Sequence, residues 1–277
     1  MIFAIDMRAS TDRPASAGAQ KHRKPAILAA LALLPALAWA QTAPLNDTGQ
    51  TLCYSAANAS GACDEATTGH TGARPGQDGR FGRDAAQATG VLPAKTGGGE
   101  AGFDFTALNA SGDATTPGTH ACVKDNVTGL TWEVKQTGNG TQPRYAGHLY
   151  TWYDSSADNP GSQGNNSCNG TLPGNQCNTQ AYVAAVNAAG LCGKSDWRMP
   201  TRRELLSLVH NGLTDAPAID RQYFPDVGST WGNWYWWTSD TYAPSPAFAW
   251  FVYFDYGVVG YDVKTYTNAV RLVRSGQ

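Results

Sequence analysis

The placement of six cysteines restricts the fold of this 277-residue chain more than any other feature. All six follow residue 50, behind a stretch with the features of an export signal, and an even number of cysteines in an exported chain predicts disulfide bonds. Six cysteines allow 15 pairings, among which the sequence alone does not choose. We favour two local bridges and one long one: Cys53 with Cys63, Cys168 with Cys177, and Cys122 with Cys192. A metal site is disfavoured, because no two cysteines have C-x-x-C spacing.

The first 40 residues have the three parts of a secretory signal peptide. A basic stretch at residues 21–24 precedes an apolar run at residues 25–39, and residues 38–40 form an A-x-A cleavage site. The apolar run is shorter than the ~20 residues of a membrane-spanning helix. We therefore expect cleavage near Ala40 and no transmembrane segment. The mature protein is expected to be secreted, periplasmic or attached to the cell surface.

The chain is weakly acidic and poor in charge. Charged residues make up 15% of it and hydrophobic residues 42%, which excludes a disordered acidic tail, a collagen and a coiled coil. Five of the 20 Lys and Arg but only two of the 22 Asp and Glu lie in the first 40 residues, so the remainder carries a net charge of −5. Nucleic-acid binders normally carry a basic surplus. We expect no nucleic-acid partner.

Residues 41–118 form a glycine-rich segment with few apolar side chains. Of these 78 residues 14 are Gly, and such a segment cannot bury a sizeable core by itself. We expect an extended, turn-rich segment that lies on the main domain. The predicted division is a signal peptide at 1–40, this segment at 41–118 and a folded domain at 119–277.

The folded domain begins with a predicted hairpin and continues with two predicted helices. Strand patterns at residues 122–125 and 130–134 flank a turn of sequence NVTG. Helical spacing of apolar residues indicates a helix over 179–189, which the following glycine ends. Thr201 and Glu204 have the spacing of a capping box, which predicts the start of a second helix.

The C-terminal third is rich in aromatic residues and has the alternation of β-strands. Residues 231–256 contain 12 aromatics in 26 positions. Alternation in the strand after residue 249 predicts one buried and one presented face. We expect Trp236, Trp250 and Phe254 to be buried. The order of elements predicts an α+β fold with a mostly antiparallel sheet, closed by pairing of the chain ends.

Three motifs in the right order resemble one known family. They are VKDNxTGLxW at residues 123–132, DWRMPTxxEL at 196–205, and YWWTS at 235–239 with AWxVxFxxG and VRxVR after it. This pattern resembles the Lcl C-terminal domain family, named for a domain of a bacterial collagen-like adhesin. The resemblance implies a C-type-lectin-like fold with two helices and an extracellular binding role. The named member binds sulfated glycans.

The exposed residues of the C-terminal strands are the candidate ligand-binding residues. The sequence is also similar to variable proteins of the same lectin-like fold, which bacterial retroelements diversify at such positions. The candidates are Asp240, Tyr242, Phe251, Tyr253, Asp255, Tyr256, Val259, Tyr261, Asp262, Tyr266 and Asn268. A site for sulfated sugars would need clustered arginines, for which the chain offers Arg198, Arg202, Arg203, Arg271 and Arg274.

Three functions are compatible with these residues. The favoured one is an adhesin-like protein that binds an extracellular glycan or protein surface with aromatic side chains. The first alternative is a retroelement-diversified variable protein that binds a receptor. The second alternative is a structural envelope protein with the glycine-rich segment as spacer. An enzyme is not expected, because G-x-S-x-G and H-E-x-x-H motifs are absent.

No cofactor is expected. Residues 154–159 offer oxygen ligands for calcium, but the chain lacks the Glu-Pro-Asn or Gln-Pro-Asp triplet of calcium-dependent sugar-binding lectins. Oligomeric state stays open.

Overall fold

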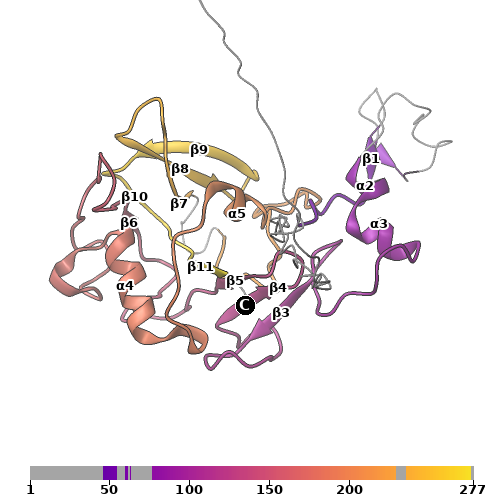
Figure 1. Cartoon of the computed structure of the whole chain (residues 1–277), viewed down its shortest axis with the longest axis horizontal. Coiled ribbons are helices and arrows are strands. Elements are labelled where there is room, and N and C mark those ends of the chain that lie inside the picture. The colour runs from indigo at the N-terminus through magenta and orange to yellow at the C-terminus, as the bar shows by residue number, and fades with distance from the viewer. Residues whose placement is uncertain (1–45, 55–59, 62, 64–76, 229–234, 276–277) are drawn as a thin grey trace, which may run out of the picture. The chain divides into compact units, whose positions relative to one another are not determined.

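A computed structural model describes residues 46–54, 60–61, 63, 77–228 and 235–275, all within the compact unit of residues 42–277. The predicted signal peptide lies outside the described residues. Figure 1 shows the arrangement of the helices and strands. The protein is α+β, with few helices and antiparallel sheets, as predicted.

A four-stranded antiparallel sheet joins the two ends of the folded domain. Its order is β11 (Val273–Ser275), β5 (Leu130–Glu133), β4 (Cys122–Asp125) and β3 (Phe105–Leu108). β4 and β5 are the predicted hairpin, and the Asp125 carboxylate accepts hydrogen bonds from the main-chain N–H groups of Val127 and Thr128 in its turn. Pairing of β11 with β5 confirms that the chain ends meet.

A second antiparallel sheet is formed by the aromatic-rich C-terminal third. Its order is β7 (Tyr235–Thr241), β8 (Phe248–Tyr253) and β9 (Val258–Val263). Two further pairs are short: β6 (Tyr150–Thr151) with β10 (Thr267–Asn268), and β1 (Cys53–Tyr54) with β2 (Ser60–Gly61). The register of β7 against β8 is interrupted between Trp237 and Thr241, whereas β8 pairs with β9 without interruption.

Both predicted helices are present, with the caps that the sequence indicates. In α4 (Thr179–Ala189), Asn178 caps the N-terminus by accepting from the Ala181 N–H at 2.8 Å, and Gly190 ends the helix with φ of 65°. α5 (Arg202–Leu206) starts with the capping box of Thr201 and Glu204. The other helices in the described residues are α2 (Asp78–Phe81), α3 (Arg83–Ala88) and two 3₁₀ turns, Pro173–Asn175 and Leu191–Gly193.

Two hydrophobic clusters lie on opposite faces of β7. One cluster contains Trp132, Leu205, Trp236 and Phe254, and the other contains Tyr182, Trp197 and Trp237. Successive residues of a strand point to opposite faces, so the neighbours Trp236 and Trp237 belong to different clusters. Burial of Trp236 and Phe254 confirms two of the three expected core aromatics. Trp250 is the exception: it is only half-buried.

Part of the glycine-rich segment belongs to the folded core. β3 pairs with β4, and Phe103, Phe105 and Ala107 are buried in the cluster of Trp132. The boundary after residue 118 therefore does not separate this part from the sheet. The rest of the segment has few apolar side chains. Polar contacts also join the segment to the domain: the Asn46 side chain donates a hydrogen bond to the Asp125 carboxylate at 2.9 Å.

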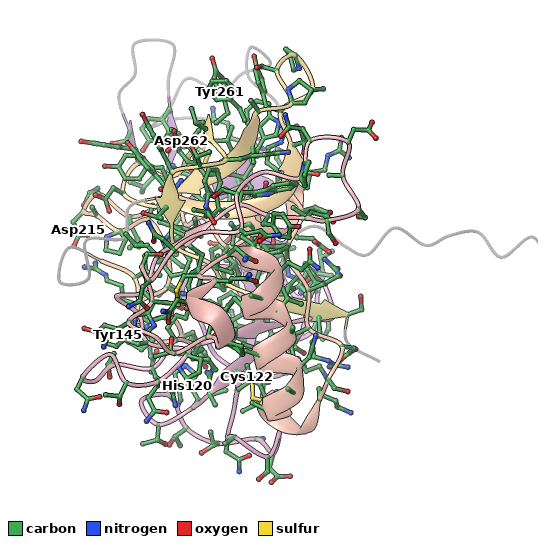
Figure 2. All side chains as sticks on the ribbon, turned by 90° about the vertical axis from the view of Figure 1, so that its left-hand side faces the viewer. His120, Cys122, Tyr145, Asp215, Tyr261 and Asp262 are labelled. Atoms are coloured by element: carbon green, nitrogen blue, oxygen red, sulfur yellow. A yellow bond between two sulfur atoms is a disulfide. The ribbon has the colours of Figure 1, made fainter. Side chains whose placement is uncertain are left out.

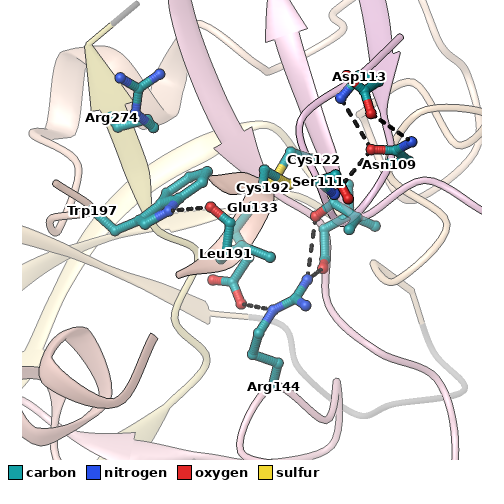
Figure 3. The surroundings of a disulfide bond; sticks show 12 residues. Asn109, Ser111, Asp113, Cys122, Glu133, Arg144, Leu191, Cys192, Trp197 and Arg274 are labelled. Carbon is teal, nitrogen blue, oxygen red and sulfur yellow. Dashed lines mark hydrogen bonds and ion pairs between the residues drawn. A yellow bond between two sulfur atoms is a disulfide. The ribbon is translucent and has the colours of Figure 1, made fainter. Parts of the chain in front are cut away.

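All three favoured disulfides are formed: Cys53 with Cys63, Cys168 with Cys177, and Cys122 with Cys192. The long bridge fastens the start of β4 to the turn after α4, as Figure 3 shows. Among the described residues, no helix is long and apolar enough to cross a membrane.

Candidate ligand-binding site

The candidate site lies where the start of α5 meets the interrupted part of β7. The Ser239 N–H donates to the Pro200 carbonyl at 2.7 Å, and the Arg202 N–H donates to the Asp240 carboxylate. These bonds hold the Asp240 side chain against the first turn of α5. The irregular register of β7 makes this approach possible, because it moves Asp240 out of the regular ladder with β8.

An indole forms the floor of the site. The Arg202 guanidinium lies over the Trp250 ring, 4.3 Å from its centroid, which is cation–π geometry. Trp250 is directly opposite Tyr261 in the β8–β9 ladder, and the two ring centroids are 5.9 Å apart. The ring of Tyr242 meets the same indole edge-on at 5.1 Å. These contacts fix the orientation of Trp250, although it is half-buried.

Two tyrosines extend the aromatic surface outward. The rings of Tyr242 and Tyr261 are stacked, with centroids 4.1 Å apart and planes 9° from parallel. Tyr261 is 50% exposed and lies together with Asp262, away from His120 and Cys122 (Figure 2). We call Trp250 of β8, Tyr261 of β9 and Tyr242, which follows β7, the aromatic platform.

A cavity of about 400 Å³ opens beside this platform. It is lined by Thr201, Arg202, Arg203, Asp240, Thr241 and Trp250. Among the described residues, the Arg202 guanidinium has no hydrogen bond or ion pair, so its N–H groups are free to donate to a ligand. The cavity thus combines an indole, two guanidinium groups, one carboxylate and hydroxyl groups.

A second aromatic row lies on the opposite face of the same sheet. Ring centroids are 4.3 Å apart for Phe251 and Tyr235, 4.9 Å for Tyr235 and Tyr253, and 5.2 Å for Tyr253 and Tyr256. The Tyr253 hydroxyl contacts the Asp255 carboxylate at 3.3 Å, and partial burial raises the pKa of Asp255. Tyr253 and Trp250 are three residues apart in β8, which places them on opposite faces.

The predicted ligand-binding residues therefore do not form one surface. Asp240 lines the cavity, and Tyr242 and Tyr261 lie beside it against Trp250. Phe251, Tyr253, Asp255 and Tyr256 lie on the other face. Val259 and Asp262 lie on the edge strand β9, and Tyr266 follows it. The expectation that Asn268 is exposed is wrong, because its pairing with Tyr150 in the β6–β10 ladder buries it.

Sequence reasoning left Trp250 and Thr201 out of the site. Strand alternation predicted that Trp250 is a core residue. Its place in the site is shown only by its contact with Arg202, which lies in α5, far from Trp250 in the sequence. Of the five candidate arginines, three are held by carboxylates: Arg198 by Glu204, Arg271 by Asp226 and Arg274 by Asp196. Arg202 and Arg203 are the two that line the cavity.

A buried charge network in the interior ties β5 to α4. Lys135 donates to the Tyr182 hydroxyl at 2.7 Å, and Glu133 contacts both Lys135 and Arg144 (Figure 3 shows Glu133 with Arg144). Burial lowers the pKa of Lys135 to about 8, even though the Glu133 charge opposes this shift. Burial favours a higher pKa for Glu133, but the charges of Lys135 and Arg144, together with hydrogen bonds from the Tyr182 hydroxyl and the Leu272 N–H, hold this pKa below the ordinary range. Each of these charged groups has a partner within the fold. We therefore interpret the network as structural: it holds β5 and α4 in place.

The loop considered for calcium is held by its own residues. The Asp154 carboxylate accepts hydrogen bonds from the N–H and hydroxyl of Ser156. Within the described ranges, no three His, Cys, Asp or Glu side chains are grouped as metal ligands.

The fold and the site define a disulfide-bonded α+β domain with an open aromatic cavity on a three-stranded sheet. The sequence model of the Lcl C-terminal domain matches residues 121–274, more than half of the chain, so the protein belongs to this family. β3 lies outside the matched region. No curated protein and no solved structure matches the chain.

Proposed function

We propose that this protein is an exported, adhesin-like carbohydrate-binding protein, and that the sugar binds at the cavity beside Trp250. The observation that carries the proposal is the half-open Trp250 indole with a free guanidinium on one side and a carboxylate beside it. The predicted signal peptide and the three disulfides support an extracellular setting.

The chemistry of the cavity suits a sugar ring. Sugars present C–H groups on their faces and hydroxyl groups around their rims, so they combine stacking on an aromatic ring with hydrogen bonds at the edge. The Trp250 indole, whose ring Arg202 partly covers, and the half-exposed Tyr261 ring offer the aromatic surface for stacking. Asp240 accepts hydrogen bonds from hydroxyl groups and Arg202 donates to their oxygens.

The site is preorganised, which lowers the cost of binding. Asp240 is held by the Arg202 N–H, and Trp250 is held between Arg202, Tyr242 and Tyr261. Few side-chain rotations have to be frozen when a ligand enters.

A glycan array with the purified protein, with and without calcium and at two salt concentrations, tests the proposal. Binding of defined glycans is expected, and calorimetry should show it weakened about tenfold or more by Tyr261→Ala or Asp240→Asn. Tyr256→Ala is the matched control, since this exposed tyrosine contacts Tyr253 in the aromatic row of the opposite face, whereas Tyr261 contacts Trp250. Absence of glycan binding, or equal loss with Tyr256→Ala, would contradict a sugar site at this cavity.

A second candidate function is binding of a protein surface by the opposite aromatic row. The row of Phe251, Tyr235, Tyr253 and Tyr256 supports it, because rigid aromatic side chains make good contact surfaces. Binding to a protein that Tyr253→Ala abolishes and Tyr261→Ala leaves intact would favour this function over the carbohydrate site.

A further inference from the structure

A second cavity opens at the end of the β4–β5 hairpin that lies away from its turn. It has a volume of about 760 Å³ and is lined by residues 110 and 118–121, by residues 134–139, 142 and 144, and by Pro225. It shares no lining residue with the cavity beside Trp250, and His120, which lines it, lies away from Tyr261 in Figure 2. Its volume is in the range of small-molecule sites. We call it the Arg144 cavity.

The ionisable side chains of the Arg144 cavity are basic. Among its described lining residues they are His120, Lys135 and Arg144, and none is Asp or Glu. His120 carries no charge in this arrangement, because its Nδ1 accepts a hydrogen bond from the Gly118 N–H at 3.1 Å and its Nε2 donates to the Tyr223 carbonyl at 2.7 Å. The positive charge at the cavity therefore comes from Lys135 and Arg144.

Lys135 and Arg144 share one counter-charge. The Glu133 carboxylate lies 3.6 Å from the Lys135 Nζ and 3.2 Å from the Arg144 Nε. The other buried carboxylate of this network, that of Asp226, pairs with Arg271. Burial lowers the pKa of Lys135 to about 8, which is still above neutral pH, so Lys135 stays mostly protonated at pH 7. Three positive charges therefore face two negative charges beside the cavity.

Arg144 has one nitrogen that the fold does not use. Its Nε donates to the Glu133 carboxylate, and its Nη2 donates to the main-chain carbonyls of Ala121 and Val134 (Figure 3). The described part of the chain supplies no hydrogen-bond partner for Nη1, and this nitrogen is not enclosed, since the side chain is 13% exposed. The other bonds fix the plane of the guanidinium. Nη1 is thus preorganised to donate to a ligand in the cavity.

Uncharged polar side chains form the rim of the cavity. Thr119, Gln136, Thr137 and Gln142 are exposed, and within the described ranges their side chains have no hydrogen bonds. Hydroxyl and amide groups both donate and accept, so they can bind the hydroxyl groups of a ligand. Apart from the imidazole of His120, no aromatic ring is found among the described lining residues. The cavity therefore has no surface on which a sugar ring would stack.

We propose that the Arg144 cavity binds a small polar carboxylate, such as a hydroxy acid. The carboxylate accepts a hydrogen bond from Arg144 Nη1 and balances the extra positive charge, and the hydroxyl groups of the ligand bind the polar rim.

The charge and the donors of the cavity together select this class of ligand. The single extra positive charge matches one carboxylate. A dianion such as phosphate usually binds several cationic or N–H donors, whereas Arg144 supplies one free nitrogen. The site does not rest on the proposed carbohydrate binding, because the two cavities have different lining residues.

An NMR titration of the purified protein with gluconate, at constant ionic strength, tests the proposal. Gluconate has one carboxylate and several hydroxyl groups, and sorbitol is its uncharged counterpart. Gluconate is expected to bind with a dissociation constant on the order of 1 mM, because few groups contact it, whereas sorbitol should not bind measurably. Amide shifts are expected in residues 134–144 and not at Trp250.

Two variants of the exposed Gln142 test where the carboxylate binds. Gln142→Glu adds a negative charge to the rim and should weaken gluconate binding about fivefold, whereas Gln142→Lys should strengthen it by a similar factor. Gln180→Glu is the matched control and should leave the affinity unchanged, since the exposed Gln180 side chain contacts the Ser155 N–H at the start of α4. Unfolding midpoints verify that each variant folds.

Three results would overturn the proposal. One is equal binding of gluconate and sorbitol, or no binding of gluconate far above the expected dissociation constant. Another is a change of affinity in the same direction in both Gln142 variants, or an equal loss in Gln180→Glu. The third is tighter binding of inorganic sulfate than of gluconate. If gluconate binds at the Trp250 cavity instead, Tyr261→Ala weakens it and the Gln142 variants do not.

Discussion

Trp236 and Trp237 are adjacent in β7, yet their indoles are fully buried in different hydrophobic clusters. The Trp237 indole N–H donates to the Tyr150 carbonyl at 2.8 Å, while Trp236 packs against Phe254 and the Arg271 guanidinium. β7 therefore forms the partition between the two halves of the core. The stability of the domain and the position of the candidate site both depend on this strand.

Replacing Trp236 should be far more costly than replacing Trp250. Trp236→Ala is expected to lower the free energy of unfolding by about 3–5 kcal/mol, because it empties a fully buried indole site. Trp250→Ala should cost less than half of that, because Trp250 is half-buried beside a cavity. Urea denaturation measures both. Equal losses would show that Trp250 belongs to the core.

The long disulfide, Cys122–Cys192, should contribute more stability than the local disulfide Cys168–Cys177. Cys122 and Cys192 are 70 residues apart, whereas Cys168 and Cys177 are nine apart. The chain-entropy estimate gives about 4 kcal/mol for the long loop and about 2.5 kcal/mol for the short one. Denaturation of the two double Cys→Ala variants measures these losses. A larger loss for the short loop would contradict this order.

Because Lys135 is buried, the free energy of unfolding should rise as the pH rises from about 8 to 10. Its pKa is lowered by burial to about 8, so the folded state releases this proton at a lower pH than the unfolded state does. The unfolded state binds more protons in this interval, and stability therefore rises with pH. The gain is expected to be roughly 2 kcal/mol relative to Lys135→Met.

The pH dependence of urea denaturation checks this gain. The folded-state pKa of Tyr182 is raised well above 10 by burial, so loss of the Tyr182 proton from the unfolded state opposes further gain above that pH. A wild-type curve parallel to that of Lys135→Met between pH 8 and 10 would show that Lys135 keeps its ordinary pKa in the folded protein.

Two glycines with similar backbone angles should respond differently to alanine. Gly257 has φ of 63° and Gly129 has φ of 73°, so both substitutions introduce comparable backbone strain. A Cβ at Gly257 would lie 2.6 Å from Val209, whereas at Gly129 nothing lies within 4 Å. Gly257→Ala should therefore cost about 1–3 kcal/mol more than Gly129→Ala in thermal or urea unfolding. Equal costs would show that Val209 moves aside freely.

Elements specified by neighbouring residues could be predicted from the sequence. The start of α5 depends on Thr201 and Glu204, three residues apart, and the end of α4 depends on Gly190 alone. The β4–β5 hairpin follows from two short strand patterns and one turn. The favoured cysteine pairs are also present, two of them closing short loops.

Features that depend on distant residues were decided by the tertiary structure. β3 pairs with the outer side of β4 and so joins the main sheet. The glycine-rich composition of the segment that contains β3 does not predict this pairing. Trp250 is only half-buried and has the Arg202 guanidinium of α5 over its ring, while Asp240, in the interrupted part of β7, holds the Arg202 main chain. Strand alternation predicts which residues share a face of a strand. Which segments cover that face depends on residues far away in the sequence. Here the packing of α5 on the β7–β8–β9 sheet forms the cavity of the candidate site.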